Sequence, residues 1–194
     1  MPKVGMRHVV SAPITSEPVN QPIVYGTGMI ATRAVSADIM YNRDENKFYC
    51  DDVLGESDNS AASGTISIGG SEFLPEARVA LFGVRKVTQS DKTIYRMTSE
   101  PSPYIGLGYM TVMIYKGVYK YTANWIHKMQ FALSGESAKT KGETIEWQTE
   151  TATGDIMGAA IDDSGVPAFM DQVEFDNAAA AIAWLDAKAN ISSV

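Results

Sequence analysis

Alternation of apolar and polar residues, the pattern of a strand with one buried face, dominates the centre of the chain. Two long runs rich in β-branched and aromatic residues, Tyr104–Tyr115 and Val118–Ala132, are joined by only Lys116 and Gly117. Two such runs with a two-residue connection predict a β-hairpin. At about 3.3 Å per residue the second run extends roughly 50 Å, whereas a compact chain of this length is about 40 Å across. We therefore expect the hairpin to bend sharply or to project.

The second run of this hairpin divides into two faces. Every second residue from Tyr119 to Phe131 is mostly apolar or aromatic, and the residues between them are mostly polar, namely Lys120, Thr122, Asn124, Lys128 and Gln130. This alternation predicts one face in the core and the other in solvent. The first run is apolar on both faces, which is typical of a central strand that is covered on two sides.

Further strands and two helices are predicted on either side of the hairpin. Alternating or β-branched runs predict strands over residues 34–42, 65–68, 143–153 and 173–175. Pro75 and Glu76 in a first turn and Gly83 at the end predict a helix over 74–83, whose apolar face comprises Leu74, Ala77, Leu81 and Phe82. A second helix is expected over 177–188, capped by Asp176 or Asn177.

Two segments lack a clear period. Residues 1–25 combine a short apolar run, Lys3–Ala12, with Pro13, Pro18 and Pro22, and we interpret them as an extended N-terminal arm with a first strand. Residues 43–63 are dense in Asp, Asn, Ser and Gly, which predicts a long acidic loop. Loops of that length are usually functional or interfacial.

Together these elements predict a mainly β (α+β) fold. The expected architecture is two packed antiparallel sheets that form a sandwich or flattened barrel, with a flanking α-helix, a long projecting hairpin and an extended N-terminal arm. A length of 194 residues with 45% hydrophobic residues suits one domain over 1–194. Cys50 is the single cysteine, so the fold must form without an internal disulfide.

Charge and hydropathy restrict the environment in which the protein works. The net charge of −7 has the wrong sign for a protein that grips phosphate backbones, so tight nucleic-acid binding is disfavoured. The first residues contain no apolar stretch long enough for a signal peptide, and no run reaches the roughly 20 apolar residues of a membrane-spanning helix. We expect a protein that is made and used in water.

The residue types needed for catalysis are scarce. His8 lies in the predicted arm and His127 on the aromatic face of a strand, where a packed core or interface histidine is the expected role. Cys50 has no Cys-x-x-Cys partner, and the acidic residues do not match the calcium-loop spacing. Gly106 and Gly108 lack the third glycine of a dinucleotide loop. A facing pair of carboxylates, as in glycosidases, stays open because none is singled out. We expect no enzyme, no cofactor and no metal.

Several stretches taken together resemble the major tail protein (tail tube protein) family of siphophages, over nearly the whole chain. They are YCDDVLGESDNSAASGTISIG, LPEARVALFG, PYIGLGYM, KYTANWIHKMQFA, SAKTKGETIEWQTETATGDIM and DNAAAAIAWLDAKA, beside KVGMRHVVSAP and AVSADIMYN. The resemblance implies a tail-tube fold, homohexameric rings that stack into a hollow tube, and conduction of the genome during ejection. It also implies a place in the virion tail after assembly in the host cytoplasm. The implied partners are a tape measure protein, a distal tail protein and a tail terminator, with DNA passing through the lumen unbound.

The charged residues then receive two hypothetical roles. Carboxylates that face the lumen would repel phosphates and let a duplex slide, and Asp38, Glu146 and Glu150 are the candidates for this wall. Contacts between subunits or rings are assigned to the acidic loop and the hairpin turn, at Asp44, Asp51, Asp52, Glu56, Asp58, Lys116 and Gly117. The alternative for both sets is a solvated surface.

Three other functions remain beside the tail tube. The same fold serves as the inner tube of a contractile tail or of a secretion-type injection machine. A carbohydrate-binding β-sandwich on a particle surface belongs to a different class, and exposed Tyr and Trp residues would serve it. An enzyme ranks last, because the sequence contains no evident nucleophile, metal set or cofactor loop.

Overall fold

The structure is a computed structural model that describes residues 2–18, 21–43, 46–50, 53–58, 61–132, 149–159 and 166–191. Within these ranges the chain is mainly β, as predicted. The strands are β1 (Lys3–Ser16), β2 (Val24–Tyr25), β3 (Met29–Arg43), β4 (Asn46–Cys50), β5 (Val53–Asp58), β6 (Ala61–Phe73), β7 (Arg85–Gln89), β8 (Lys92–Arg96), β9 (Ile105–Tyr115), β10 (Val118–Phe131), β11 (Glu150–Met157) and β12 (Met170–Phe175). The helices are α1 (Pro75–Phe82) and α2 (Ala178–Lys188).

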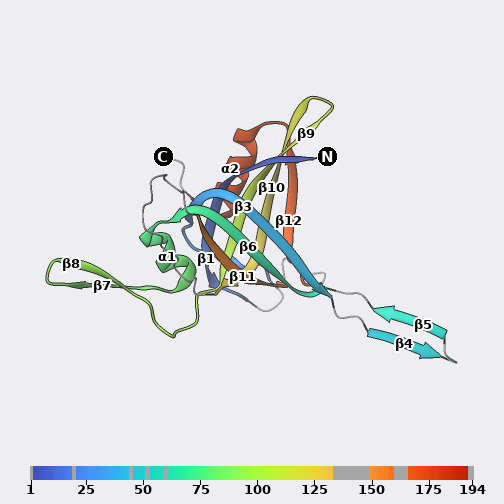
Figure 1. The fold of residues 1–194 in the computed structure, drawn as a ribbon, viewed down its shortest axis with the longest axis horizontal. Helices are drawn as coiled ribbons and strands as arrows, with labels where there is room; N and C mark the ends of the chain where they lie inside the picture. Colours follow the sequence, from blue (N-terminus) through green and yellow to red (C-terminus); the bar gives the residue numbers. More distant parts are fainter. Residues whose placement is uncertain are drawn as a thin grey trace, which may run out of the picture.

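Six strands close into an antiparallel barrel (Figure 1). Their order is β11-β6-β3-β1-β9-β10, and β10 returns to β11 through pairs that run from Lys128 with Met157 to Phe131 with Gly154. The first half of β10 pairs instead with β12, from Tyr121 to Ile126. Closing a sheet on itself satisfies the backbone groups that an open sheet leaves at its edges. The predicted sandwich or flattened barrel is thus realised as a closed barrel with extra strands.

The central hairpin is confirmed as β9–β10. Its turn consists of Lys116 and Gly117, which have φ angles of 48° and 81°. Two successive positive φ angles are what a two-residue hairpin turn needs to match the twist of its strands, and glycine adopts such an angle without strain.

The predicted division of β10 into one core face and one solvent face is wrong, because the strand contains a bulge. Between Ile126 and Met129 the ladder with β9 shifts register, so both side chains face the barrel interior although their spacing is odd. Thr122 and Asn124, expected in solvent, are only 7% and 2% exposed. One extra residue therefore exchanges the two faces halfway along the strand.

The N-terminal segment is a barrel strand rather than an arm. Residues Lys3–Ser16 form β1, which lies between β3 and β9. His8, with a φ of 56°, falls at a register shift. Because successive strand residues face opposite sides, Val9 packs in one hydrophobic core and Val10 in the other. The prolines misled the prediction, because Pro13 falls near the end of the strand and leaves the preceding residues free to pair.

Each helix packs on a different part of the barrel. The helix α1 was predicted, and its Ala77, Leu81 and Phe82 are buried at one end of the barrel, whereas Leu74, assigned to the same face, is 52% exposed. The helix α2 was also predicted; Asn177 caps it by accepting a hydrogen bond from the Ala180 N–H at 2.7 Å. It packs on the outer face of β1, β9 and β10.

Two hairpins extend away from the barrel (Figure 1). One is β7–β8. The other is β4–β5, which corrects the prediction of an irregular loop over 43–63, because residues 46–50 and 53–58 pair as a hairpin and β6 begins at Ala61. The alternation at 143–153 is described only at its end, where β11 begins at Glu150.

Candidate functional site

The outer surface of the barrel has a covered half and a bare half. The covered half consists of β1, β9 and β10 beneath α2. The bare half, which we call the bare wall, consists of the outward residues of β3, β6 and β11, namely Ser36, Asp38, Met40, Thr65, Ser67, Thr151, Thr153 and Asp155. Their neighbours along each strand, among them Ile39, Ile66 and Ile156, point into the barrel core.

Apart from Met40, the bare wall consists of small polar residues and aspartates. Its residues stand in rows across the three strands: Asp38 pairs with Ser67, which pairs with Thr153. Met40 is 70% exposed, and Asp38 and Asp155 are exposed as well. The three segments that form the wall, 36–42, 63–69 and 151–157, contain no Lys or Arg. Asp38 is thus exposed on β3, and its predicted place in a lumen wall stays a prediction; Asp155, which sequence reasoning did not single out, is exposed on the same wall.

One edge of the bare wall lacks a strand partner. From Arg33 to Arg43, β3 pairs with β6 alone within the described chain, because its ladder with β1 is confined to residues 29–32. On the far side of β10, β12 likewise pairs along one edge only. Unpaired edges of this length present backbone donors and acceptors to any strand that approaches them.

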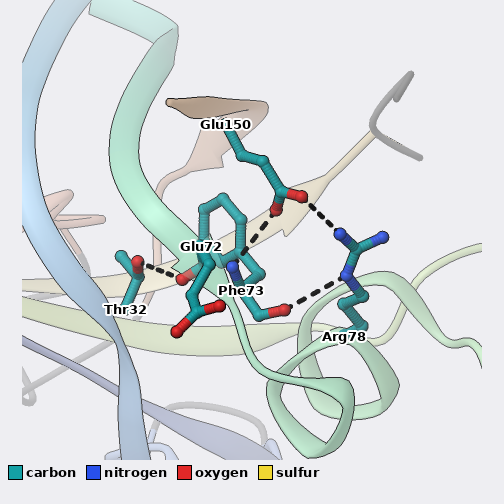
Figure 2. Close-up of polar contacts among 5 residues, drawn as sticks. All are labelled: Thr32, Glu72, Phe73, Arg78 and Glu150. Atoms are coloured by element: carbon teal, nitrogen blue, oxygen red, sulfur yellow. Dashed lines mark hydrogen bonds and ion pairs between the residues drawn. The ribbon is translucent and has the colours of Figure 1, made fainter. Parts of the chain in front are cut away.

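Glu150 is engaged inside the chain, as Figure 2 shows. Its Oε1 lies 2.5 Å from an Arg78 guanidinium nitrogen on α1, and its Oε2 accepts a hydrogen bond from the Phe73 N–H at 3.1 Å. Arg78 Nε donates in turn to the Phe73 carbonyl at 3.1 Å, and Thr32 Oγ1 donates to the Glu72 carbonyl at 2.6 Å. The carboxylate thus joins α1 to the ends of β6 and β11. Its predicted place in a lumen wall stays a prediction.

The other residues singled out from sequence are distributed over three places. Glu146, Asp44, Asp51 and Asp52 lie outside the described residues. Glu56 and Asp58 belong to β5, in the projecting hairpin. Lys116 and Gly117 form the tip of β9–β10, far along the chain from the acidic hairpin. Of the predicted contact residues that the structure describes, those on β5 and those at the tip of β9–β10 lie in different parts of the molecule (Figure 1).

An exposed apolar patch surrounds the tip of β9–β10. Tyr115, Val118 and Tyr119 are each half or more exposed, and Val4 of the adjacent β1 is 52% exposed. The ammonium of Lys116 lies 5.3 Å from the centre of the Tyr115 ring. Tyr115 and Val118 stand opposite each other on one face of the hairpin, and Tyr119 faces the other side. We call these four apolar residues the apolar tip.

The covered half is held by a polar network beneath α2. His127, predicted to be a packed histidine, is buried, and its Nε2 lies 3.0 Å from Asp171 Oδ1. The Lys188 ammonium of α2 donates to the other oxygen of Asp171 at 3.1 Å. Burial lowers the pKa of His127, with Asp171 opposing the shift. Burial also raises the pKa of Asp171, but the attraction and hydrogen bonds of His127 and Lys188 outweigh that effect and lower it.

Gly106 and Gly108 have a packing role on this half. A Cβ on Gly108 would lie 2.8 Å from both Leu185 of α2 and Trp125 of β10, and one on Gly106 would lie 2.6 Å from Trp125 and Tyr25. The Trp125 ring is fully buried here, edge-on to Tyr25 with 5.1 Å between the ring centres. The two glycines therefore make room for the indole and for α2.

Among the described residues no group of three or more His, Cys, Asp or Glu is placed to hold a metal ion. None of the described helices is long and apolar enough to span a membrane. The chain matches no protein-family model and has no significant match among curated proteins. Function must therefore be argued from the surfaces: the bare wall, the free strand edges, the apolar tip and the two projecting hairpins.

Proposed function

We propose that this chain is a structural subunit of a bacteriophage tail tube, in which rings of identical copies stack into a hollow conduit for the genome. The observation that carries the proposal is the bare wall. It is the face of the barrel that neither of the described helices covers, and its exposed charges in the segments 36–42, 63–69 and 151–157 are carboxylates. A lumen wall of this composition suits the resemblance to siphophage major tail proteins.

The chemistry of the wall favours passage of DNA over binding. Lysine and arginine hold duplexes by displacing the counterions of phosphate, and each such contact strengthens binding. Asp38 and Asp155 act in the opposite direction, since carboxylates repel the phosphate backbone. Ser67, Thr65 and Thr153 provide a hydrated surface between them. A duplex that meets this wall would find no cation to hold it.

The free edges supply a way to join copies. A ring needs two different contact surfaces on each subunit, so that the second surface of one copy meets the first surface of the next. The unpaired edge of β3 over residues 33–43 and the unpaired edge of β12 meet that requirement. Pairing them between copies would extend the bare wall into a continuous sheet and remove both edges. Six copies per ring is the number that the resemblance implies.

The bare wall and the free strand edges would serve equally well in the inner tube of a contractile tail or of a secretion-type injection machine. The carbohydrate-binding alternative draws support from Tyr115 and Tyr119, whose rings are 50% and 54% exposed at the apolar tip. Trp125, which could have stacked on a sugar, is fully buried. Glycan-array binding by the monomer, lost in a Tyr115→Ala/Tyr119→Ala variant, would favour this alternative.

Electron microscopy tests the main proposal directly. We expect concentrated purified protein, viewed by negative stain, to form hollow tubes of uniform width. Tubes next to a sheath in the particles of origin would identify the contractile alternative. A protein that stays monomeric at every concentration, alone and with extracts of infected cells, would refute the assembly proposal.

A further inference from the structure

The β7–β8 hairpin forms a two-stranded sheet of its own outside the barrel. It pairs Arg85–Gln89 with Lys92–Arg96 and projects away from the barrel beside α1 (Figure 1). Its turn residues, Ser90 and Asp91, have φ angles of 50° and 60°, the conformation of a tight two-residue hairpin turn. Within the described chain β7 and β8 pair only with each other, so the outer edge of each strand is free. An isolated two-stranded hairpin is marginally stable in water, and a third strand stabilises it.

The hairpin is strongly basic in an acidic protein. From Arg85 to Arg96 the sequence contains four basic residues and one acidic residue, while the whole chain has a net charge of −7. Arg85 stands directly opposite Arg96, an arrangement of like charges that destabilises a strand pair. Glu100 compensates Arg85 at 2.9 Å. The exposed side chains of Lys86, Lys92 and Arg96 make no ion pair with a described residue.

The outer strand β8 presents its cations in a regular row. Lys92, Ile94 and Arg96 occupy every second position, so their side chains lie on the same face of the strand. The two cations are four residues apart, which is about 13 Å along a strand. Between them Ile94 stands opposite Val87 and is still 37% exposed. The row therefore reads cation, apolar group, cation.

A strand that added to the free edge of β8 would match this row side chain by side chain. Every second residue of an antiparallel strand turns its N–H and C=O away from the partner it already has, so β8 offers both donors and acceptors at its outer edge. The side chains of an added strand would stand opposite those of β8. Carboxylates opposite Lys92 and Arg96, with an aliphatic residue opposite Ile94, give the complementary pattern acidic-x-apolar-x-acidic.

A nucleic acid fits the hairpin less well than an acidic strand does. The phosphate backbone has no hydrogen-bond donors for the free carbonyl groups of β8. The net charge of −7 also repels a long polyanion, whereas a short acidic segment meets the hairpin alone.

We propose that the free edge of β8 binds an extended acidic segment of a different protein, which joins the hairpin as a third strand with carboxylates opposite Lys92 and Arg96. The added charge would also relieve the repulsion between Arg96 and Arg85. The surface lies outside the barrel, so the inference goes beyond the proposed function. Only the choice of a different protein over a second copy rests on that function, because the proposed ring already joins the free edges of β3 and β12.

A short labelled peptide tests the edge on the full-length protein. The peptide Thr-Glu-Thr-Val-Thr-Glu-Thr should bind at low salt, measured by fluorescence anisotropy, and added salt should weaken it. We expect Lys92→Glu to weaken binding on the order of tenfold. The matched control is Lys86→Glu, the same charge change on the other face of the hairpin, which should stay within about threefold. The peptide Thr-Lys-Thr-Val-Thr-Lys-Thr should bind a Lys92→Glu/Arg96→Glu variant and not the wild type.

Two further measurements separate strand addition from general charge attraction. The peptide Glu-Glu-Thr-Val-Thr-Thr-Thr has the same composition but places its carboxylates on opposite faces, so it should bind on the order of tenfold more weakly. Backbone amides of β8 should exchange hydrogen more slowly when the first peptide is bound, since an added strand pairs with them. Thermal unfolding of the barrel should be unchanged in every variant, because within the described chain the hairpin pairs only with itself.

The outcomes distinguish this inference from its alternatives and from the proposed function. Equal losses in Lys92→Glu and Lys86→Glu, or equal binding of the two acidic peptides, would overturn it. A DNA duplex that binds more tightly than the first peptide would assign the hairpin to nucleic acid instead. Self-association of the wild type that is lost in Lys92→Glu/Arg96→Glu would make a second copy the partner and overturn the choice of a different protein. Tubes that form while the peptide fails to bind would leave the tube subunit standing, and peptide binding without tubes would refute only the tube.

Discussion

The covered and bare halves of the barrel belong to the same hydrogen-bonded sheet, but their outward-facing residues differ. On the covered half, large side chains such as Trp125 and Leu185 are fully buried between the sheet and α2. On the bare half, the outward residues are small and polar apart from Met40, which is 70% exposed. Since burial of large apolar groups stabilises a fold, the covered half stabilises the monomer. The bare half remains available for contacts with other molecules.

Removing the indole from the covered half should have the largest effect on stability. Trp125→Ala leaves a cavity next to Tyr25 and Leu185, and we expect unfolding to become easier by about 3–5 kcal/mol. The matched change on the bare wall, Thr153→Ala, should stay within about 0.5 kcal/mol. Urea unfolding followed by tryptophan fluorescence and circular dichroism measures both. Equal losses would contradict the division of the barrel into two halves.

Adding a methyl group to the covered half should be the next most disruptive change. In Gly108→Ala the new Cβ would lie 2.8 Å from Leu185 and Trp125, so α2 must shift, at a cost of about 1–3 kcal/mol. The control is Gly5→Ala on β1, where no atom lies within 4 Å of the new Cβ. Differential scanning calorimetry of the pair gives the comparison. A melting temperature equal to that of Gly5→Ala would show that α2 does not press on the sheet.

The ion pair between Arg78 and Glu150 at the barrel end should contribute less to stability than the packing of Trp125 and Gly108. Arg78 and Glu150 are 26% and 32% exposed, so solvent screens them in part, and we expect Glu150→Gln to cost about 1 kcal/mol. Glu100→Gln breaks the more exposed pair with Arg85, where the side chains are 62% and 58% exposed, and should change stability by less than about 0.5 kcal/mol. Chemical denaturation ranks the two. The reverse order would mean that Glu150 is not anchoring α1.

Acidification should weaken the covered half. The pKa of His127 is lowered in the folded protein, so the unfolded chain binds the proton more readily, and stability is full above pH 6.5 and falls as the pH drops below it. Asp171, also lowered, adds a loss in the same direction below about pH 3.8. The midpoint of urea unfolding, followed from pH 8 to 5, measures the first step. A His127→Gln variant should reduce that step, and an unchanged pH dependence would contradict it.

Charge reversal on the bare wall should have the smallest effect on stability and a distinct effect on function. Asp38 and Asp155 are exposed, so Asp38→Lys/Asp155→Lys should leave unfolding within about 0.5 kcal/mol of the wild type. Assembled tubes of this variant should retain DNA at low salt and slow its ejection, because phosphates then meet lysines. The control is Glu72→Lys/Glu76→Lys, outside the wall. Ejection at the wild-type rate in both would exclude the wall from the lumen.

Local patterns were sufficient for the β9–β10 hairpin and both helices. A two-residue turn at Lys116 and Gly117, and the caps at Asn177 and Gly83, act within a few residues, so the sequence contains the whole signal. The faces of β10 could not be predicted in this way. The bulge after Ile126 follows from the pairing with β9 and not from β10 itself, and one extra residue exchanges inside and outside.

The candidate surfaces were predictable only in part. Asp38 was identified because alternation fixes which residues share a face of a strand. Glu150 also lies in an alternating strand segment. Its partner Arg78, however, is on a helix 72 residues away in the sequence, and no local sequence pattern predicts such a pair. Asp155 was missed because the strand was predicted to end at 153, whereas β11 continues to Met157.

The central place of β1 has a consequence for how the chain is synthesised. Lys3 pairs with Met113 and Pro13 with Ile105, so β1 has no neighbour on that side until about a hundred further residues have been translated. At elongation rates of about 5–20 residues per second this delay is on the order of ten seconds. During it, Val9 and Val10, later fully buried, are exposed on the nascent chain. The segment around Val9 and Val10 is thus a place where a chaperone could bind the nascent chain.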